Sequence, residues 1–559
     1  MREVERPGGH EGRPGSSGAP GRENGGKGPR PGRLLAVFKA VALLALMAVT
    51  AYGMLKGGLY GAFEDDPWLP IAAGALVVVS VTLFVRGFYR DVPQAGWILV
   101  ALLGALVGLK GLSMVWTMSE TETVKEVLRS SMYAAVFVLS LAALTSGRQV
   151  GPLVDIAVLL VTAVAGYGLL QKISPIEYPV NSIDEVRVDS TIGYANTLAM
   201  LLGMGVVLAL ARMATMRNAV IRGIYAALVL AFLVVLYLTV SRGGIGSLGI
   251  GLILLFALVP NRLQTLANLL LVTLPGAWLF WKMRDLEALL RADVPDAQKV
   301  ADGLAFRNDL IVALVAAFVL QAVYSVVVDR YELMPAGRRV LGALALAGLV
   351  LVAGAGAFVV VSQYGGVGRA YEGLVSNPNQ TENVGQRLAS LSVGYRAEYW
   401  QVGWEAWKEH PFTGTGAGTF RYTWLEERSG EQGVKQVHNL YLEQGTETGL
   451  FAFAALVAFV VALVGYTGRA ALRSGPDGER RLLLAGLTSA LAVYLVSSVF
   501  EWHWYIPAST IFFFILAAIA VKFASRGDWG ESEPASRRSR TEREGSGDGL
   551  LQRWRSLRG

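Results

Sequence analysis

Cysteine is absent from the 559 residues of this sequence, and histidine is scarce, with four residues. Disulfides, thiolate nucleophiles and cysteine-ligated metal sites are therefore excluded. Hydrophobic residues make up 53% of the chain, which is too apolar for an ordinary soluble domain and indicates a membrane protein.

The formal charge of +7 is unevenly distributed along the chain. A basic balance alone would fit a protein that binds nucleic acid. Lys and Arg lie instead in the tails and in short segments between apolar runs, which is typical of the cytoplasmic side of a membrane protein. We therefore expect membrane lipids, and no nucleic acid, among the partners.

Two polar tails flank the apolar part of the chain. Residues 1–32 are rich in Gly, Pro, Arg and Glu, and residues 525–559 are charged, so both are predicted to be disordered cytoplasmic tails. The first apolar run, from Leu34, lies deep in the chain and lacks a small-residue cleavage site, which predicts an anchor rather than a signal peptide. Residues 33–524 are left as one polytopic membrane domain.

The apolar runs are long enough to cross a membrane, which takes about 20 residues each. They predict an all-α polytopic membrane protein with about 12–14 transmembrane helices and a large extracytoplasmic loop, about residues 364–438, between two late helices. The fourteen runs start near Leu34, Leu69, Ala95, Val127, Leu153, Ile192, Val220, Gly243, Leu266, Leu310, Val340, Leu440, Leu482 and Pro507.

Basic residues follow every even-numbered run, as in the segment from Arg212 to Arg222 and the segment from Arg469 to Arg481. Because short cytoplasmic loops carry an excess of Lys and Arg, we expect a multi-pass protein of the cytoplasmic membrane with both termini in the cytoplasm. The long loop, Arg242 and His438 then share the outer face.

Arg242 lies between two apolar runs, within "TVSRGG". An arginine at such a place is costly and often functional, but an interfacial arginine that snorkels to lipid headgroups explains it equally well. The two glycines that follow would let the chain turn tightly and bring backbone amides close to an anion.

The long loop combines arginines, tryptophans and glycines in "YRAEYWQVGWEAWKEHPFTGTGAGTF". Its tryptophans, from Trp400 on, share one helical face, which fits a helix on the bilayer surface or one packed on the bundle. Gly414 and Gly416 would form a backbone nest for phosphate, or simply a turn. Arg387 and Arg396 precede them, although most loop arginines are merely solvated.

His438 and Asn439 stand just before the run that starts at Leu440. One interpretation is a helix cap, with Tyr441 as an aromatic residue of the membrane interface. The other is a functional site. Glu447 favours the second interpretation, because a cap does not explain a carboxylate two turns inside an apolar run.

Taken together, these motifs resemble the O-antigen ligase and Wzy O-antigen polymerase superfamily. The resemblance rests on Arg396 with Trp400, on the Pro-x-x-Gly-x-Gly-x-Gly-x-Phe pattern at 411–420, and on the His-Asn-x-Tyr-Leu pattern from His438. The "SRGG" at 241–244 and the "GYANTLAM" that contains Asn196 are similar to two further motifs of the family.

The resemblance implies a GT-C-like glycosyltransferase in cell-surface polysaccharide biosynthesis. Such an enzyme moves a glycan from a polyprenyl diphosphate, undecaprenyl diphosphate in the family, to a hydroxyl acceptor on a lipid or a growing glycan. Arg242 and Arg396, with Arg387 third, would hold the diphosphate, and His438 would be the general base. The remaining substrate-binding residues implied are Asn196, Trp400, Gly414, Gly416, Asn439, Tyr441 and Glu447.

No cofactor is expected. No Asp-x-Asp pair occurs in the outer segments, so arginine would replace a divalent cation and no metal site is predicted.

Two other functions stay open from the sequence. One is a transporter or flippase of lipid-linked glycans, which would show inverted repeats. The other is a peptidoglycan polymerase of the shape and division type. Ligase and polymerase are not separated, and His503 is a weaker second candidate at the outer face.

Overall fold

The computed structural model describes residues 31–61, 66–181, 186–328, 394–429, 433–475 and 478–525, with single residues and short stretches between 337 and 369. Most of both tails, Arg387 and parts of the run expected from Val340 lie outside the described residues. The described residues are helical, with no strand among them, which confirms the all-α class.

Eleven of the described helices are long and apolar enough to cross a membrane. They are α1 (Pro31–Leu55), α3 (Gln94–Leu112), α4 (Glu120–Ala143), α5 (Val150–Ile173), α6 (Ala195–Thr215), α7 (Ala219–Leu238), α9 (Arg262–Met283), α10 (Asp296–Val328), α16 (Leu440–Arg473), α17 (Glu479–Ser497) and α18 (Pro507–Ala524). Two shorter apolar helices are α2 (Leu69–Leu83) and α8 (Arg242–Leu258). The polytopic architecture expected from the sequence is therefore confirmed.

The centre of the bundle is formed by α6, α17 and α18. The apolar window of α18 is 94% buried, whereas that of α1, at the periphery, is 22% buried. Small residues let these helices approach closely, as they do in membrane proteins generally. A Cβ at Gly486 of α17 would lie 2.4 Å from Ala211 of α6, and one at Gly251 of the adjoining α8 would lie 2.4 Å from Val493 of α17. This tightly packed centre is the rigid support for the segments at its ends.

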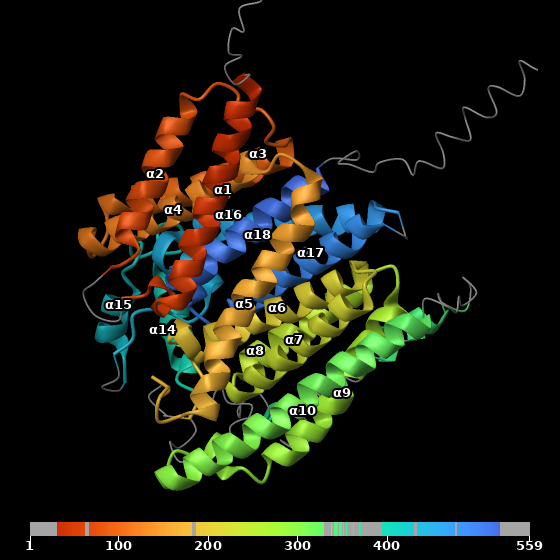
Figure 1. Cartoon of the computed structure of the whole chain (residues 1–559). Helices are drawn as coiled ribbons and strands as arrows, with labels where there is room; N and C mark the ends of the chain where they lie inside the picture. The colour runs from red at the N-terminus through yellow and green to blue at the C-terminus, as the bar shows by residue number, and fades with distance from the viewer. Residues whose placement is uncertain are drawn as a thin grey trace, which may run out of the picture.

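The remaining helices surround this centre (Figure 1). The α9 and α10 helices run side by side along one flank and pack against α7, while α1 and α2 lie on the opposite flank. Two short helices, α14 (Arg396–Glu409) and α15 (Phe420–Glu427), belong to the long loop and sit at one end of the bundle, where α14 packs on α16.

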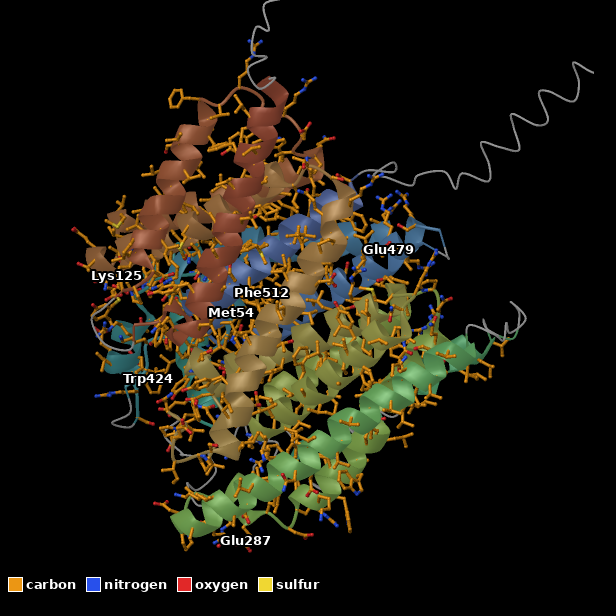
Figure 2. All side chains as sticks on the ribbon, in the orientation of Figure 1. Met54, Lys125, Glu287, Trp424, Glu479 and Phe512 are labelled. Carbon is orange, nitrogen blue, oxygen red and sulfur yellow. The ribbon has the colours of Figure 1, made fainter. Side chains whose placement is uncertain are left out.

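The two ends of the bundle differ in chemistry. Lys125 and Trp424 both lie at the end that carries α14 and α15, called the loop-domain end below, whereas Glu479 lies at the far end (Figure 2). At that far end, called the basic end, Arg212 pairs with Asp155 at 2.7 Å. The loops with excess arginine thus gather away from the loop domain.

Candidate active site at the loop-domain end

The start of α16 carries a sharp turn with His438 at its centre. His438 has φ = +58°, in the left-handed region that few side chains adopt. The side chain of Asn439 accepts hydrogen bonds from the backbone N–H groups of Tyr441 and Leu442, each at 3.1 Å. Asn439 is therefore the helix cap. This leaves the imidazole of His438 without a capping role.

The imidazole of His438 is held in one tautomer. Its Nδ1 lies 3.0 Å from the backbone oxygen of Gln436, and because a carbonyl can only accept, Nδ1 carries the proton. The other nitrogen, Nε2, has no hydrogen-bond partner in the described part of the chain. The ring packs against Tyr399 and Trp502, with ring centroids 5.3 and 6.0 Å away. The unpaired Nε2 therefore has a free lone pair, with which a general base accepts a proton.

The electrostatic surroundings keep this histidine neutral. Burial, and then the positive charge of Arg396, lower the pKa of His438 to about 3. The hydrogen bond to Gln436 acts in the opposite direction and is the smaller effect. In the free protein the ring is thus an uncharged base, with a pKa well below the ordinary value near 6.5.

Arg396 opens α14 and forms an ion pair with Glu501, which lies between α17 and α18. The carboxylate of Glu501 also accepts hydrogen bonds from Asn196 and from the hydroxyl of Tyr194, both at 2.7 Å. It is buried, with 6% of its side chain exposed. Glu501 therefore connects the loop helix to the start of α6.

A second arginine extends this network. Arg187 donates to the side-chain oxygen of Asn196 and, through Nε, to the backbone oxygen of Thr239 at 2.8 Å. Asn196, expected as a site residue, thus lies between Arg187 and Glu501. Arg187, Tyr194 and Glu501 were not expected from the sequence. The one available signal was the position of Glu501 two residues before His503, in "EWHWYIP".

Arg242 is the first residue of α8, three residues after Thr239. The hydroxyl of Ser241 caps this helix through the N–H of Gly244 at 3.2 Å. A Cβ at Gly243 would lie 3.9 Å from that of Phe500, whose ring contacts Trp400 at 6.2 Å between centroids. The start of α8 and α14 therefore both adjoin the segment that carries Glu501.

Two nitrogen donors on α14 are left without acceptors. The Nε of Arg396 and the indole Nε1 of Trp400 are both buried, and neither has a hydrogen-bond partner among the described residues. These side chains are four positions apart and so share one face of the helix. Buried donors without acceptors are uncommon in proteins, so these two N–H groups are candidates for contact with a ligand that carries acceptor oxygens.

The glycine loop before α15 does not present the phosphate nest expected from the sequence. The N–H of Gly414 donates to the backbone oxygen of His410 at 2.9 Å. The N–H of Gly416 donates to the backbone oxygen of Glu447 at 2.8 Å. The N–H of Gly418 and that of Phe420 donate to the carboxylate of Glu447 at 2.8 and 3.1 Å. Because the protein itself occupies these amides, we assign Gly414, Gly416 and Glu447 to holding the loop on α16.

The other aromatic and histidine residues have structural contacts. Tyr441 donates to the backbone oxygen of Leu495 at 3.0 Å and joins α16 to α17. Trp407 covers Gly445, where an added Cβ would lie 2.5 Å from the indole, and Trp404 is exposed.

His503 is fully buried, with its ring nitrogens 2.8 Å from the hydroxyl of Thr197 and 2.7 Å from that of Ser497. Both ring nitrogens of His503 are thus occupied by hydroxyl groups of the protein, unlike Nε2 of His438.

No group of three or more His, Cys, Asp or Glu side chains suited to a metal ion occurs among the described residues. The polar groups described at this end are the imidazole of His438, the ion pair of Arg396 with Glu501, and Arg187 on Asn196. These features define a polytopic membrane protein with a polar, arginine-rich site at one end of the bundle.

Residues 304–457 match the family model described as O-Antigen ligase. The match supports the O-antigen ligase and polymerase superfamily for this chain and confirms the resemblance predicted from the motifs. It also supports a ligase-type or polymerase-type function in general terms. Arg396 and His438 lie inside the matched region, and Arg242 and Asn196 lie before it. No curated protein matches the sequence.

Proposed function

We propose that this protein is a glycosyltransferase of the O-antigen ligase or polymerase type. It transfers a glycan from a polyprenyl diphosphate carrier to a hydroxyl acceptor at the outer face of the cytoplasmic membrane. The observation that carries the proposal is the His438 imidazole, with Nδ1 bonded to Gln436 and Nε2 unpaired, under the electrostatic influence of Arg396.

The reaction assigned to this site is a displacement at the anomeric carbon. The acceptor oxygen forms a bond to that carbon while its proton moves to Nε2 of His438. The bond between the anomeric carbon and the phosphate oxygen breaks, and polyprenyl diphosphate leaves with the electron pair. Negative charge grows on the leaving oxygen, so positively charged groups near it stabilise the transition state.

The arginines fit the role of holding the diphosphate. Arg396 pairs with Glu501, Arg187 bonds to Asn196 in the same network, and Arg242 begins the neighbouring helix α8. The unpaired N–H donors of Arg396 and Trp400 face a common side of α14 and suit phosphate oxygens. Arginine charge then does the work that a divalent cation does elsewhere, so we propose metal-independent transfer without a cofactor.

The membrane orientation follows from the arginine-rich loops. These loops gather at the basic end, where Arg481 also donates to the backbone oxygen of Leu258 at 2.8 Å. The positive-inside rule then favours a cytoplasmic basic end and an outer loop-domain end. We therefore propose that both termini are cytoplasmic and that the glycan donor binds from the outer leaflet.

The experiment that tests this function uses the full-length protein in lipid nanodiscs. It is incubated with a polyprenyl-diphosphate-linked oligosaccharide and a panel of lipid, glycan and peptide acceptors, and the products are identified by mass spectrometry. We expect a glycosylated acceptor together with free polyprenyl diphosphate, in equal amounts with and without chelator. Absence of transfer to every acceptor, or loss of transfer that magnesium restores, would contradict the proposal.

A further inference from the structure

An acidic groove lies between α14 and α15, the two helices of the loop domain, which pack side by side (Figure 1). Its volume is about 360 Å³. No Lys or Arg of the described residues lines it, whereas five carboxylates do, those of Glu398, Glu405, Glu409, Glu426 and Glu427. His438, Arg396 and Glu501 do not line it, so the groove is separate from the candidate active site.

The groove lies on the side of α14 that faces away from the candidate active site. Because an α-helix has 3.6 residues per turn, Glu398, Glu405 and Glu409 share one face of α14. Arg396 and Trp400 lie on the opposite face and contact the segment between α17 and α18. Substitutions in the groove therefore leave the side chains of the candidate active site in place.

The walls of the groove are held together by contacts of their own. Tyr399 of α14 packs edge to face on Trp424 of α15, with ring centroids 4.9 Å apart. The carboxylate of Glu398 accepts hydrogen bonds from the N–H and the hydroxyl of Ser429, at 3.1 and 2.6 Å, and so joins α14 to the segment after α15. The groove is thus formed before a ligand binds, which lowers the entropic cost of binding.

Three carboxylates and one hydroxyl in the groove have capacity left for a ligand. Glu409, Glu426 and Glu427 are exposed and form no ion pair with another described residue. Thr423 lines the groove from α15, is 7% exposed, and has a hydroxyl without a hydrogen-bond partner in the described part of the chain. A buried hydroxyl without a partner is uncommon, and a ligand in the groove would supply one.

The lining suits lysine side chains. Val402 and Ala406 are buried and add apolar surface to the groove, along which the alkyl stem of a lysine packs while its ammonium reaches a carboxylate. Lys408 of α14 already pairs in this way with Glu405, at 2.5 Å. Glu405 and Glu409 are one turn apart, about 6 Å along the helix axis. Alternate side chains of an extended segment have a similar spacing, about 6.6 Å.

A peptide segment fits the groove better than a free polyamine does. A polyamine only donates hydrogen bonds, whereas the hydroxyl of Thr423 also has a hydrogen to donate, which a backbone carbonyl accepts. From Glu398 to Glu409 the helix rises about 16 Å. That length accommodates about three side chains on one side of an extended segment.

From these contacts we infer that the groove is a docking site for an extended, lysine-bearing segment of a partner protein. The ammonium groups pair with the carboxylates of α14 and α15, and the backbone of the segment bonds to Thr423. The partner thereby binds the loop domain on the side opposite Arg396. The inference goes beyond the proposed function and does not depend on it.

The test measures peptide binding to the full-length protein in phosphatidylcholine nanodiscs by fluorescence polarisation. The probe is a fluorescein-labelled synthetic peptide with three lysines at alternate positions, separated by alanine, and its counterpart with three glutamates is the negative control. Glu409→Gln combined with Glu426→Gln removes two unpaired carboxylates. The matched control, Glu287→Gln combined with Asp293→Asn, removes two exposed carboxylates outside the groove.

We expect the dissociation constant of the lysine peptide to rise about fivefold to tenfold in the groove variant, since each exposed ion pair contributes up to about fivefold. It should change less than about twofold in the control variant. Added salt should weaken binding to the wild type, because the pairs are exposed to solvent.

Thr423→Val tests the backbone contact apart from charge. Valine replaces the hydroxyl by a methyl group of similar size, so the dissociation constant should rise about threefold to tenfold, as for loss of one hydrogen bond. The unfolding temperature of this variant should not decrease, because the substitution removes a buried group that has no partner in the free protein. Weaker binding is then not caused by unfolding.

Two results would overturn the inference. If the lysine peptide does not bind, or binds the Glu409→Gln, Glu426→Gln variant as it binds the wild type, the groove is not its docking site. If spermidine binds as tightly as the peptide and Thr423→Val has no effect, the groove is a site for small cations and not for a peptide segment. Glycan transfer by the same variants should equal that of the wild type. Failure of the wild type to transfer glycan would contradict the proposed function and leave the binding result unaffected.

Discussion

The guanidinium of Arg396 and the carboxylate of Glu501 form an ion pair between residues 105 positions apart in the chain. The pair joins the first turn of α14 to the segment before α18. Because the carboxylate of Glu501 also accepts from Asn196 and Tyr194, it is held in place from three sides. Arg396 is thereby oriented with its Nε still available for another acceptor.

Glu501 is expected to act as a positioning residue. Glu501→Gln keeps the side-chain shape but removes the charge that fixes Arg396, so kcat should fall about tenfold or more, as for loss of a buried charged hydrogen bond. The KM for the glycan donor should change little or fall, because the site becomes more positive. Steady-state kinetics separate the two. Glu479→Gln, at the basic end, is the matched control and should change kcat less than about twofold. Wild-type kinetics in Glu501→Gln would show that the pair has no role.

The arginines should require their planar shape and not only their charge. Arg242→Ala and Arg396→Ala should each abolish transfer while the protein still inserts into the membrane. Lysine lacks the fork that grips two phosphate oxygens, so Arg→Lys should recover only a minor part of the rate. Transfer assays on purified variants measure this, with Arg291→Lys as an exposed control. Full activity in either lysine variant would mean that charge alone suffices.

Membrane topology gives an independent prediction. With the basic end in the cytoplasm, a reporter that is active only outside the cytoplasm should work when fused after residue 375 and fail when fused after residue 475. A cytoplasmic reporter should give the opposite pattern. The loop-domain end would then be outside, where the lipid-linked glycan donor is presented. The reverse pattern would place the site on the wrong face for the proposed transfer.

Spans could be predicted from the sequence because each is a continuous apolar run whose signal is local. Even the break at "SRGG" was visible, and α8 begins there. The hydrogen-bond partners of the glycine loop could not be predicted from the sequence in this way. Its amides are occupied by Glu447 from another helix, a contact set by how the loop folds back on α16. A glycine pattern alone does not show whether its N–H groups are free.

The site shows the same division between local and long-range information. Asn439 could be recognised as a cap because a cap bonds to the two or three residues that follow it. Glu501 was missed because its partners come from distant segments, and its neighbours are aromatic residues typical of a membrane interface. The Asn439 side chain makes both capping bonds itself, so the cap expected at this point is Asn439, and a catalytic role of His438 stays a prediction.

Asn439 should tolerate any residue that caps a helix. Serine caps well and carries no charge, so Asn439→Ser should keep most of the transfer rate, whereas Asn439→Ala should lose about 1 kcal/mol of stability. Thermal unfolding followed by tryptophan fluorescence and transfer kinetics check the two effects. If Asn439 contacts the substrate through its amide, Asn439→Ser will lose activity without losing stability, and the capping assignment will be incomplete.

His438 is expected to be the general base, and its backbone decides which variant tests this. At φ = +58° alanine would be strained, while asparagine adopts the left-handed region more readily than most residues. His438→Asn should therefore fold normally, bind the glycan donor through the arginines, and lose about a hundredfold to ten-thousandfold in kcat. His410→Asn changes an exposed histidine at the same end and should leave kcat unchanged.

The pH dependence separates a base from a residue that only donates a hydrogen bond. Protonation of Nε2 removes the base, so the rate falls as pH drops through the pKa of His438. Burial, then Arg396, lower this pKa to about 3, so kcat/KM, which reports the free enzyme, should stay flat from neutral pH to well below 6.5. Bound diphosphate adds negative charge, which raises the pKa, so the acid limb of kcat should lie at higher pH than that of kcat/KM.

Acid unfolding of the protein must be distinguished from this decrease of the rate at low pH. The pKa of His503 is also lowered to about 3, by burial and then by the charges of Arg396 and His438. Between about pH 6.5 and 3 the unfolded chain therefore binds more protons than the folded one, and the free energy of unfolding decreases as pH falls. His438→Asn should remove part of this decrease together with the acid limb of kcat. A limb of kcat/KM at pH 6.5 in the wild type, or one that persists in His438→Asn, would show that another group is the base.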